Sequence, residues 1–255
     1  MSRYARYPSL EGRVVFISGG ASGIGACLVE EFCAQGAAVA FVDIDAAAGD
    51  ALAQRLAQEG KRRPLPLVVD VRDIPAYQAK IAEAAAALGP IAVLINNAAR
   101  DDRHKVDDVT ADYWDDCLAV NLRHHLFAAQ AVLPGMRQAG WGSIQNLGSV
   151  SWMRGRDGMI GYVTSKAAIH GLTRALAREV GPDNIRVNSV VPGGIVTERQ
   201  NRLWRTAELD KSLLDAQCLK RRLVPEDVAR MVLWLAADDS DGCTGQAFLV
   251  DGGIV

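Results

Sequence analysis

The stretch RVVFISGGASGIGACLVEEF, residues 13–32, decides the fold of this chain. It opens on an apolar, β-branched run at 13–18, continues through closely spaced glycines and ends in an amphipathic helical pattern. Glycines let a backbone turn tightly and approach a pyrophosphate, and the free N–H groups of a following helix attract the phosphate charge. A glycine-rich turn alone is a weak signal. Strand, loop and helix in this order predict a dinucleotide site built from Gly19, Ser22, Gly23, Ile24 and Gly25.

Outward from this stretch, short β-branched runs alternate with longer Ala- and Leu-rich segments, a pattern typical of successive βα units. Strands are predicted at residues 13–18, 38–43, 65–70, 91–96, 142–148, 185–191 and 247–251. Right-handed crossovers then give an α/β fold, a doubly wound (Rossmann) seven-stranded parallel sheet with helices on both faces and ligands at the carboxyl ends of the strands. No linker interrupts the alternation, so residues 1–255 are predicted to form a single domain.

The composition argues against several classes of partner. Lys and Arg number 28 against 30 Asp and Glu, for a formal net charge of -2, so no overall field holds nucleic acid or an anionic membrane surface. The cysteines form no CxxC pair and are odd in number, which indicates neither a disulfide framework nor a metal cluster. We therefore expect no metal and no nucleic-acid partner.

The first residues and the most apolar segment indicate where in the cell the protein is expected. Residues 1–12 hold no apolar stretch that would serve as a signal peptide, and they are interpreted as a short surface lead-in. The apolar stretch 81–95 is interrupted by Glu83 and by Gly89-Pro90, and it falls short of the roughly 20 residues that a membrane helix needs. A cytoplasmic protein without a membrane span is expected.

Asp43 ends the second predicted strand, where an acidic side chain can accept hydrogen bonds from the adenosine ribose hydroxyls. The same carboxylate would repel a 2′-phosphate, and neither loop 19–25 nor residues 44–48 contain Arg or Lys to hold one. NAD is therefore predicted in preference to NADP. Taken alone, Asp43 would equally be a helix N-cap or a solvated acid. Asp70, followed by Val71, closes the third strand and makes a weaker candidate for facing the adenine.

Tyr162 and Lys166 lie one turn apart on a long predicted helix and so share a face. A phenol acts as a base near neutrality only if its pKa falls from about 10 to about 7, which costs roughly 4 kcal/mol. An ammonium some 4 Å away supplies about 1 kcal/mol in water but about 4 kcal/mol at an effective dielectric near 20. The pair is therefore expected to act inside a cleft.

Three further polar side chains are candidates. Ser149 follows a predicted strand at the carboxyl edge of the sheet, where its hydroxyl would orient a reacting oxygen. Ser151 competes for this role, and either serine would also suit a simple turn. Asn121, taken alone, is an ordinary mid-helix amide.

The motifs GGASGIG, Asp70, NNAA (96–99), Asn121, Ser149, YxxxK and PGGIVT (192–197) occur in this order along nearly the whole chain. This set resembles the short-chain dehydrogenase/reductase family. The resemblance implies a catalytic tetrad of Asn121, Ser149, Tyr162 and Lys166, with Asn121 anchoring a water that links Lys166 to solvent. It implies further cofactor contacts at Asn97, Ala98, Pro192, Gly193, Ile195 and Thr197. Ser18 stands where the family usually has Thr, and Ala99 where it has Gly, which puts loop stability in doubt.

A closer resemblance, to bacterial NAD-dependent aldose 1-dehydrogenases of the D-xylose and L-arabinose type, rests on DDRHK (101–105), NLRHHLF (121–127), SWM (151–153), RALAREVGPDNIRV (174–187) and AQCLK (216–220). It implies oxidation of the anomeric C1–OH of a pentose or hexose to the lactone, and a homotetramer. Segments that should border the sugar carry Ser151, Trp152, Arg154, Asp102, Arg103, Arg199 and Gln200. Trp152 is preferred for stacking on a sugar face, although each of these residues also suits a surface or packing role.

The charged segment 198–222 is a candidate substrate lid. Within the same chemistry, the alternative substrate is another secondary alcohol or ketone, such as a keto-acid or a carrier-bound acyl group. A non-catalytic dinucleotide-binding regulator or scaffold is a remote alternative, against which the intact Asn121, Ser149, Tyr162 and Lys166 argue.

Overall fold

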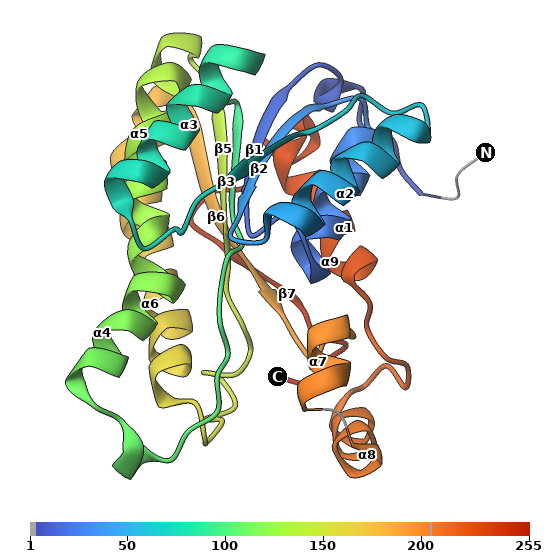
Figure 1. Cartoon of the computed structure of the whole chain (residues 1–255), viewed down its shortest axis with the longest axis vertical. Coiled ribbons are helices and arrows are strands. Elements are labelled where there is room, and N and C mark those ends of the chain that lie inside the picture. The colour runs from blue at the N-terminus through green and yellow to red at the C-terminus, as the bar shows by residue number, and fades with distance from the viewer. Residues whose placement is uncertain (1–3, 205) are drawn as a thin grey trace.

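A computed structural model describes residues 4–204 and 206–255. Its centre is one parallel sheet in the strand order β3-β2-β1-β4-β5-β6-β7 (Figure 1). The strands are β1 Val14–Ser18, β2 Ala38–Asp43, β3 Leu65–Val68, β4 Val93–Asn96, β5 Gly142–Leu147, β6 Ile185–Pro192 and β7 Ala247–Val250. The predicted doubly wound, seven-stranded fold is confirmed, and the strand ends differ from the prediction by one or two residues.

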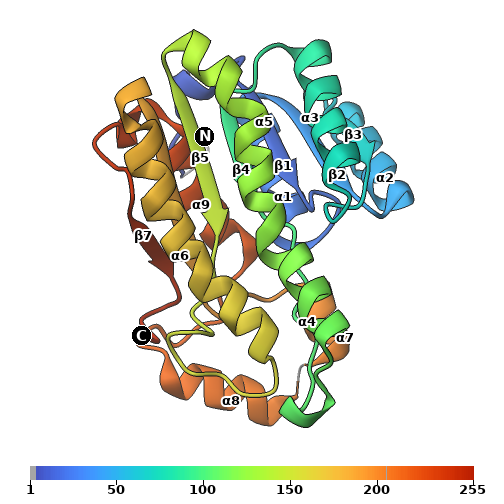
Figure 2. The ribbon, with the colours of Figure 1, turned by 90° about the vertical axis from the view of Figure 1, so that its left-hand side faces the viewer.

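Helices cover both faces of the sheet (Figures 1 and 2). One face carries α1 Gly23–Ala34, α2 Ala46–Gln58 and α9 Pro225–Ala236, and the other carries α3 Ile74–Leu88, α5 His124–Ala139 and α6 Ile160–Val180. Successive side chains of β1 point to opposite faces of the sheet. Val15 and Ile17 pack into one apolar cluster, and Val14 and Phe16 pack into the other. The central strands are therefore buried on both faces, as their uniformly apolar sequences predict.

The strand order reverses between β1 and β4, since the chain winds outward from β1 in both directions. Such a switch point leaves a crevice at the carboxyl ends of the two strands, which is where ligands bind in sheets of this kind. The remaining helices, α4 Ala111–Leu118, α7 Glu198–Leu203 and α8 Ala207–Ala216, lie toward this end of the sheet (Figures 1 and 2).

The segment 198–222 is less irregular than its sequence suggests, because it contains α7 and α8. Each helix begins at a threonine whose hydroxyl accepts an N–H three residues on, Thr197 from Gln200 and Thr206 from Leu209. The two ends of the segment meet at a parallel bridge between Ile195 and Leu223. The segment therefore leaves and rejoins the sheet at one place.

Within the part of the chain that the structure describes, no helix has the length and apolar character needed to cross a membrane. All five cysteines carry free thiols.

Candidate active site

Two positions in the turn from β1 into α1, Gly19 and Gly25, have room for glycine only. An added Cβ on Gly25 would lie 1.8 Å from the carbonyl oxygen of Gly19, and one on Gly19 would lie 2.9 Å from Cα of Ala98. Gly19 also has a φ of +68°, in the left-handed region. The hydroxyl of Ser22 caps no N–H of α1, so the first amides of this helix start without an intrahelical or side-chain acceptor. The loop and the helix start therefore fit a pyrophosphate.

Asn97 and Ala98 fasten the end of β4 to the glycine loop. Their backbone amides donate to Oγ of Ser18 over 3.0 and 3.1 Å. The amide of the Asn97 side chain donates to the carbonyl oxygens of Ser18 and Gly19. Ser18 thus makes these hydrogen bonds with its own hydroxyl, although the family usually has Thr at this position.

Asp43 lies at the carboxyl end of β2, beside the glycine loop. Its Oδ2 accepts the Ala21 N–H over 2.9 Å and its Oδ1 accepts the Asp45 N–H over 3.2 Å. A carboxylate oxygen can accept a second hydrogen bond, so the ribose hydroxyls would still find acceptors here. The N-cap role falls to Asp45, whose side chain accepts the Ala48 N–H at the start of α2.

The Asp70 carboxylate is already paired with an arginine of the chain. The guanidinium of Arg72 binds both carboxylate oxygens, and this pairing holds the pKa of Asp70 below its usual value. The Val71 side chain is buried in the apolar cluster that also contains Tyr77 and Ile81. Asp70 and Val71 as cofactor contacts stay predictions.

Tyr162 and Lys166 share one face of α6, as their spacing predicts. The Lys166 side chain is 2% exposed, and its Nζ donates to the carbonyl oxygen of Leu147 at the end of β5, over 2.7 Å. The same nitrogen lies 5.5 Å from the centre of the Tyr162 ring. Oγ of Ser149 and Oγ of Ser151 form a hydrogen bond of 2.8 Å just past β5. Both candidate serines therefore reach this site together.

Burial dominates the electrostatics of the pair. It raises the pKa of Tyr162 to about 12, and the Ser149 side chain acts in the opposite direction. It lowers the pKa of Lys166 to about 7, against a raising effect of Asp101. The sequence led us to expect that the charge of Lys166 would lower the pKa of Tyr162. Without a bound cofactor the pKa of Tyr162 is instead raised, because burial penalises the charged forms of both side chains. Lys166, not Tyr162, changes charge near neutral pH.

Asn121 lies in a π-helical turn, Ala119–Arg123, between α4 and α5, and not in an ordinary helix. Its Nδ2 donates to the Cys117 carbonyl over 3.0 Å, and its Oδ1 accepts the Arg100 N–H over 2.8 Å. Single π turns occur often at functional sites. The turn packs against α6, but the water that the resemblance implies for Asn121 stays a prediction.

The 192–197 segment lies between the glycine loop and the last strand. An added Cβ on Gly193 would lie 2.8 Å from Cα of Asp251, and one on Gly23 would lie 3.5 Å from Cγ2 of Thr197. Ile195 is buried, and Pro192 ends β6. The predicted nicotinamide segment and the predicted pyrophosphate loop are thus neighbours.

The predicted sugar-binding residues separate into two groups. Asp102 pairs with Arg199, and Gln200 donates to the adjacent Asp101, where α7 approaches the loop after β4. Arg103 joins them, 3.8 Å from Asp101.

The second group lies on the loop after β5. Trp152 donates its indole N–H to His170 of α6 over 3.1 Å, so only its ring faces remain for a sugar. The side chain of Arg154 is exposed at the surface.

Sequence reasoning missed Asp101. Its carboxylate accepts hydrogen bonds from Arg199 and Gln200, and its charge acts on the pKa of both Tyr162 and Lys166. Two adjacent aspartates cannot be told apart by sequence pattern, since the loop conformation alone decides which of them contacts Gln200.

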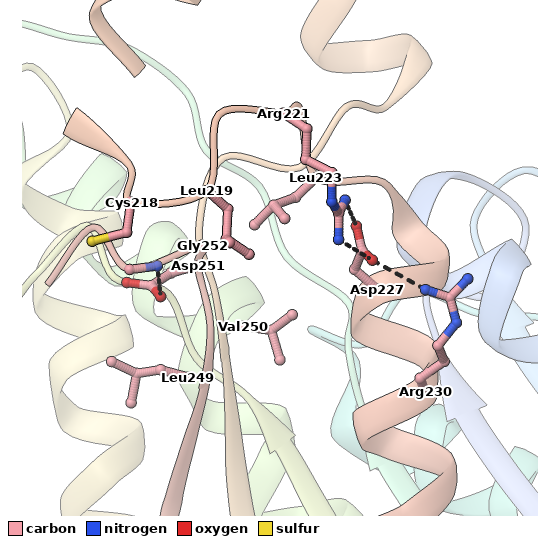
Figure 3. A pocket seen from close by; sticks show the side chains of 11 residues that line it. Cys218, Leu219, Arg221, Leu223, Asp227, Arg230, Leu249, Val250, Asp251 and Gly252 are labelled. Carbon is pink, nitrogen blue, oxygen red and sulfur yellow. Dashed lines mark hydrogen bonds and ion pairs between the residues drawn. The ribbon is translucent and has the colours of Figure 1, made fainter. Parts of the chain in front are cut away.

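A separate pocket of about 430 Å³ opens between α9, β7 and residues 218–223 (Figure 3). Asp227 occupies one side of it, paired in a fork with Arg221 and also with Arg230. None of the residues predicted for catalysis or for cofactor binding lines this pocket. These ion pairs anchor the carboxyl end of the 198–222 segment to α9.

A family model described as enoyl-(acyl carrier protein) reductase matches residues 19–255. A D-xylose 1-dehydrogenase of Caulobacter vibrioides is 50% identical over 252 residues, and a probable galactose dehydrogenase, GalD, of Rhizobium meliloti is 48% identical over 250. Both alignments cover 98% of this chain and 98% of the relative. The chain belongs to the short-chain dehydrogenase/reductase family. A solved mutant of a Serratia marcescens short-chain dehydrogenase/reductase superposes with a TM-score of 0.89 at 33% identity, covering 96% of this chain and 99% of the other.

The family resemblance predicted from the motifs is thereby confirmed, and with it an oxidoreductase that uses a nicotinamide cofactor and a small-molecule substrate. The glycine loop and the start of α1 fit such a cofactor, since a single added Cβ at Gly25 would fill the turn that must face its phosphates.

Proposed function

We propose that this short-chain dehydrogenase oxidises the anomeric C1–OH of an aldose to the lactone, with NAD as cofactor and Tyr162 as the general base. The observation that carries the proposal is the pair of sugar dehydrogenases that are 48% and 50% identical to this chain over nearly the full length of each. The placing of Lys166 against the end of β5, close to the Tyr162 ring, and the hydrogen bond of Ser149 to Tyr162 support it.

The nicotinamide cofactor, when bound, would accept the hydride from C1. The chain's own residues would manage the proton of the C1 hydroxyl. Ser149 would orient the sugar O1, and the phenolic oxygen of Tyr162 would take its proton. Since burial holds the pKa of Tyr162 near 12, the tyrosine must pass its own proton onward. Lys166, with its pKa lowered to about 7, is the neighbour able to gain or lose one near neutrality.

NAD is proposed over NADP because Asp43, a carboxylate at the end of β2 beside the glycine loop, would meet the adenosine ribose and repel a 2′-phosphate. Residues 44–48 supply no Arg or Lys to hold a 2′-phosphate. Both oxygens of Asp43 are fixed by backbone amides, so the carboxylate does not need to move to meet a ribose.

The segment 198–222 is proposed to act as a lid. The bridge between Ile195 and Leu223 gives it a single base. Its last residues are tied to the C-terminal tail, since Cys218 and Leu219 donate to the carbonyls of Gly253 and Gly252. Movement is therefore expected in α7 and α8, and not in residues 217–222.

A homotetramer and a cytoplasmic location complete the proposal. β7 is an edge strand whose Leu249 side chain is exposed, and a partner subunit would cover it. Five free thiols suit a reducing compartment. Light scattering tests the subunit number, and a monomer would contradict it.

A panel of substrates tests the function. NADH formation at 340 nm is followed with D-xylose, L-arabinose, D-galactose and their epimers, and NADP is substituted for NAD in parallel. Keto-acids and carrier-bound acyl groups are offered with the reduced cofactors. We expect an aldose to give the highest kcat/KM, with NAD. Faster turnover of a keto-acid or a carrier-bound acyl group would contradict the proposal.

A further inference from the structure

We propose that Asp101 determines which aldose the site accepts, by binding sugar hydroxyls away from C1 together with Gln200 of α7. This inference rests on the proposed function, because it names the residue that distinguishes the substrates of that reaction.

The position of Asp101 relative to the reacting groups sets it apart from its neighbour. It follows β4 in the same loop as Asn97 and Ala98, which contact the glycine loop. Its side chain is 15% exposed, and its charge acts on Tyr162 and on Lys166. Asp102, in contrast, is 38% exposed, and its charge acts on Tyr113 and Cys117 of α4. Of the two aspartates, Asp101 is the one on the side of the catalytic pair.

The partners of Asp101 come from the lid. Nε of Arg199 lies 3.3 Å from its Oδ1, and Nε2 of Gln200 lies 2.7 Å from its Oδ2. A guanidinium nitrogen of Arg103 lies 3.8 Å from the same Oδ2. The carboxylate is thus held between the loop after β4 and α7.

This cluster has unused hydrogen-bonding capacity. A carboxylate has about four lone-pair sites, so Asp101 can still accept from hydroxyl groups. Gln200 also has an amide oxygen, which can accept another. Arg103 lies over the ring of Trp204, and the buried indole N–H of Trp204 has no acceptor among the described residues. Donors and acceptors of both kinds therefore lie together, and the charges of Asp101 and Arg103 both act on Tyr162.

Such a cluster suits a polyhydroxylated ligand better than a simple ketone. A sugar hydroxyl both donates and accepts, and an epimer places one hydroxyl in a different direction. A site built to hydrogen-bond a hydroxyl rejects the ligand that leaves its partly buried groups unpaired. The alternative is that Asp101 only holds α7 in place. This is less satisfactory, because Arg199 is exposed and a surface ion pair of this kind contributes little to stability.

The test compares Asp101→Asn and Asp101→Glu with Asp107→Asn, which changes an exposed aspartate further along the same connection. For each protein, kcat and KM are measured on the preferred aldose and on its C2, C3 and C4 epimers, and the Kd for NAD is measured by fluorescence. We expect Asp101→Asn to lower kcat/KM for the preferred aldose at least about tenfold, chiefly through KM. The ratio of kcat/KM between that aldose and its epimers should fall at least about fivefold.

Asp101→Glu keeps the charge but moves the oxygens, so it should lower the epimer ratio as well. Asp107→Asn should leave the ratio within about twofold of the parent, and all three variants should bind NAD as the parent does, within about twofold. Thermal unfolding checks each fold, and if Asp101→Asn does not fold, Asp101→Glu decides.

If the Asp101 variants oxidise aldoses with an unchanged epimer ratio, this inference is contradicted and the proposed function is not. An equal loss of the ratio in Asp107→Asn contradicts it too. Absence of any aldose turnover by the parent contradicts the proposed function, and this inference with it.

Discussion

The ammonium group of Lys166 is hydrogen-bonded to the carbonyl oxygen of Leu147 over 2.7 Å, in a place where the lysine side chain is almost fully removed from water. This one contact ties the second turn of α6 to the end of β5, where the chain turns into the segment that carries Ser149. A lysine held in this way has its charged form penalised by burial, which lowers its pKa to about 7.

The stability of the fold should therefore depend on pH through Lys166. Between pH 7 and about 8.5 the unfolded chain keeps this lysine protonated, whereas the folded chain has begun to release the proton. The folded state then binds fewer protons than the unfolded state, so the free energy of unfolding should rise with pH in this window. Chemical denaturation of the parent and of Lys166→Met measures it, and the rise should be smaller in the variant. Parallel curves for the two proteins would contradict the lowered pKa.

Gly25→Ala should strongly weaken dinucleotide binding. Its Cβ would lie 1.8 Å from the carbonyl oxygen of Gly19, so the turn must open and its amides must move. We expect the Kd for NAD to rise at least about 100-fold in isothermal titration.

The matched control is Gly171→Ala on α6, where an added Cβ meets nothing within 4 Å. It should stabilise the protein by about 0.5–1 kcal/mol and leave the Kd unchanged. Equal binding by Gly25→Ala and the parent would show that the phosphates do not approach this turn.

Asp43→Asn should weaken the preference for NAD. The variant loses the negative charge that repels a 2′-phosphate, and the ratio of kcat/KM for NAD over NADP should fall about tenfold or more. Asp45→Ala removes a carboxylate two residues away, which caps α2. It should cost about 1 kcal/mol in the free energy of unfolding but keep the ratio. A ratio that falls in Asp45→Ala and holds in Asp43→Asn would reverse the assignment.

Trypsin should detect the lid. Arg199 and Arg202 lie on α7, outside the part of the segment that is tied to the C-terminal tail. With NAD and the preferred aldose together, cleavage after these arginines should slow at least about fivefold, whereas NAD alone should have less effect. Mass spectrometry identifies the cut sites. Cleavage at the same rate with and without both ligands would count against a lid.

The sequence predicted the parts of this fold that depend on local pattern. The uniformly apolar runs correctly placed the strands, because strands buried on both faces leave no polar alternation. The four-residue spacing of Tyr162 and Lys166 correctly placed them on one face of α6.

Features that depend on contacts between distant segments escaped sequence reasoning. The π turn around Asn121 is accompanied by a hydrogen bond from the Arg100 backbone, and no local pattern contains that partner. The choice between Asp101 and Asp102 depends on where α7 comes to rest. The pKa of Tyr162 was expected to fall, since burial of the tyrosine itself could not be weighed from sequence against the charge of Lys166.

The most direct test of the account is the rate of aldose oxidation by Tyr162→Phe, measured with NAD binding in the same preparation. Tyr113→Phe is the control. It also removes one phenolic hydroxyl, but that hydroxyl lies on α4 and is hydrogen-bonded to His104. We expect kcat to fall by at least about 1000-fold in Tyr162→Phe and by less than about threefold in Tyr113→Phe, with the Kd for NAD within about twofold of the parent in both. A Tyr162→Phe protein that binds NAD and oxidises the sugar within about tenfold of the parent rate would contradict the assignment of the base.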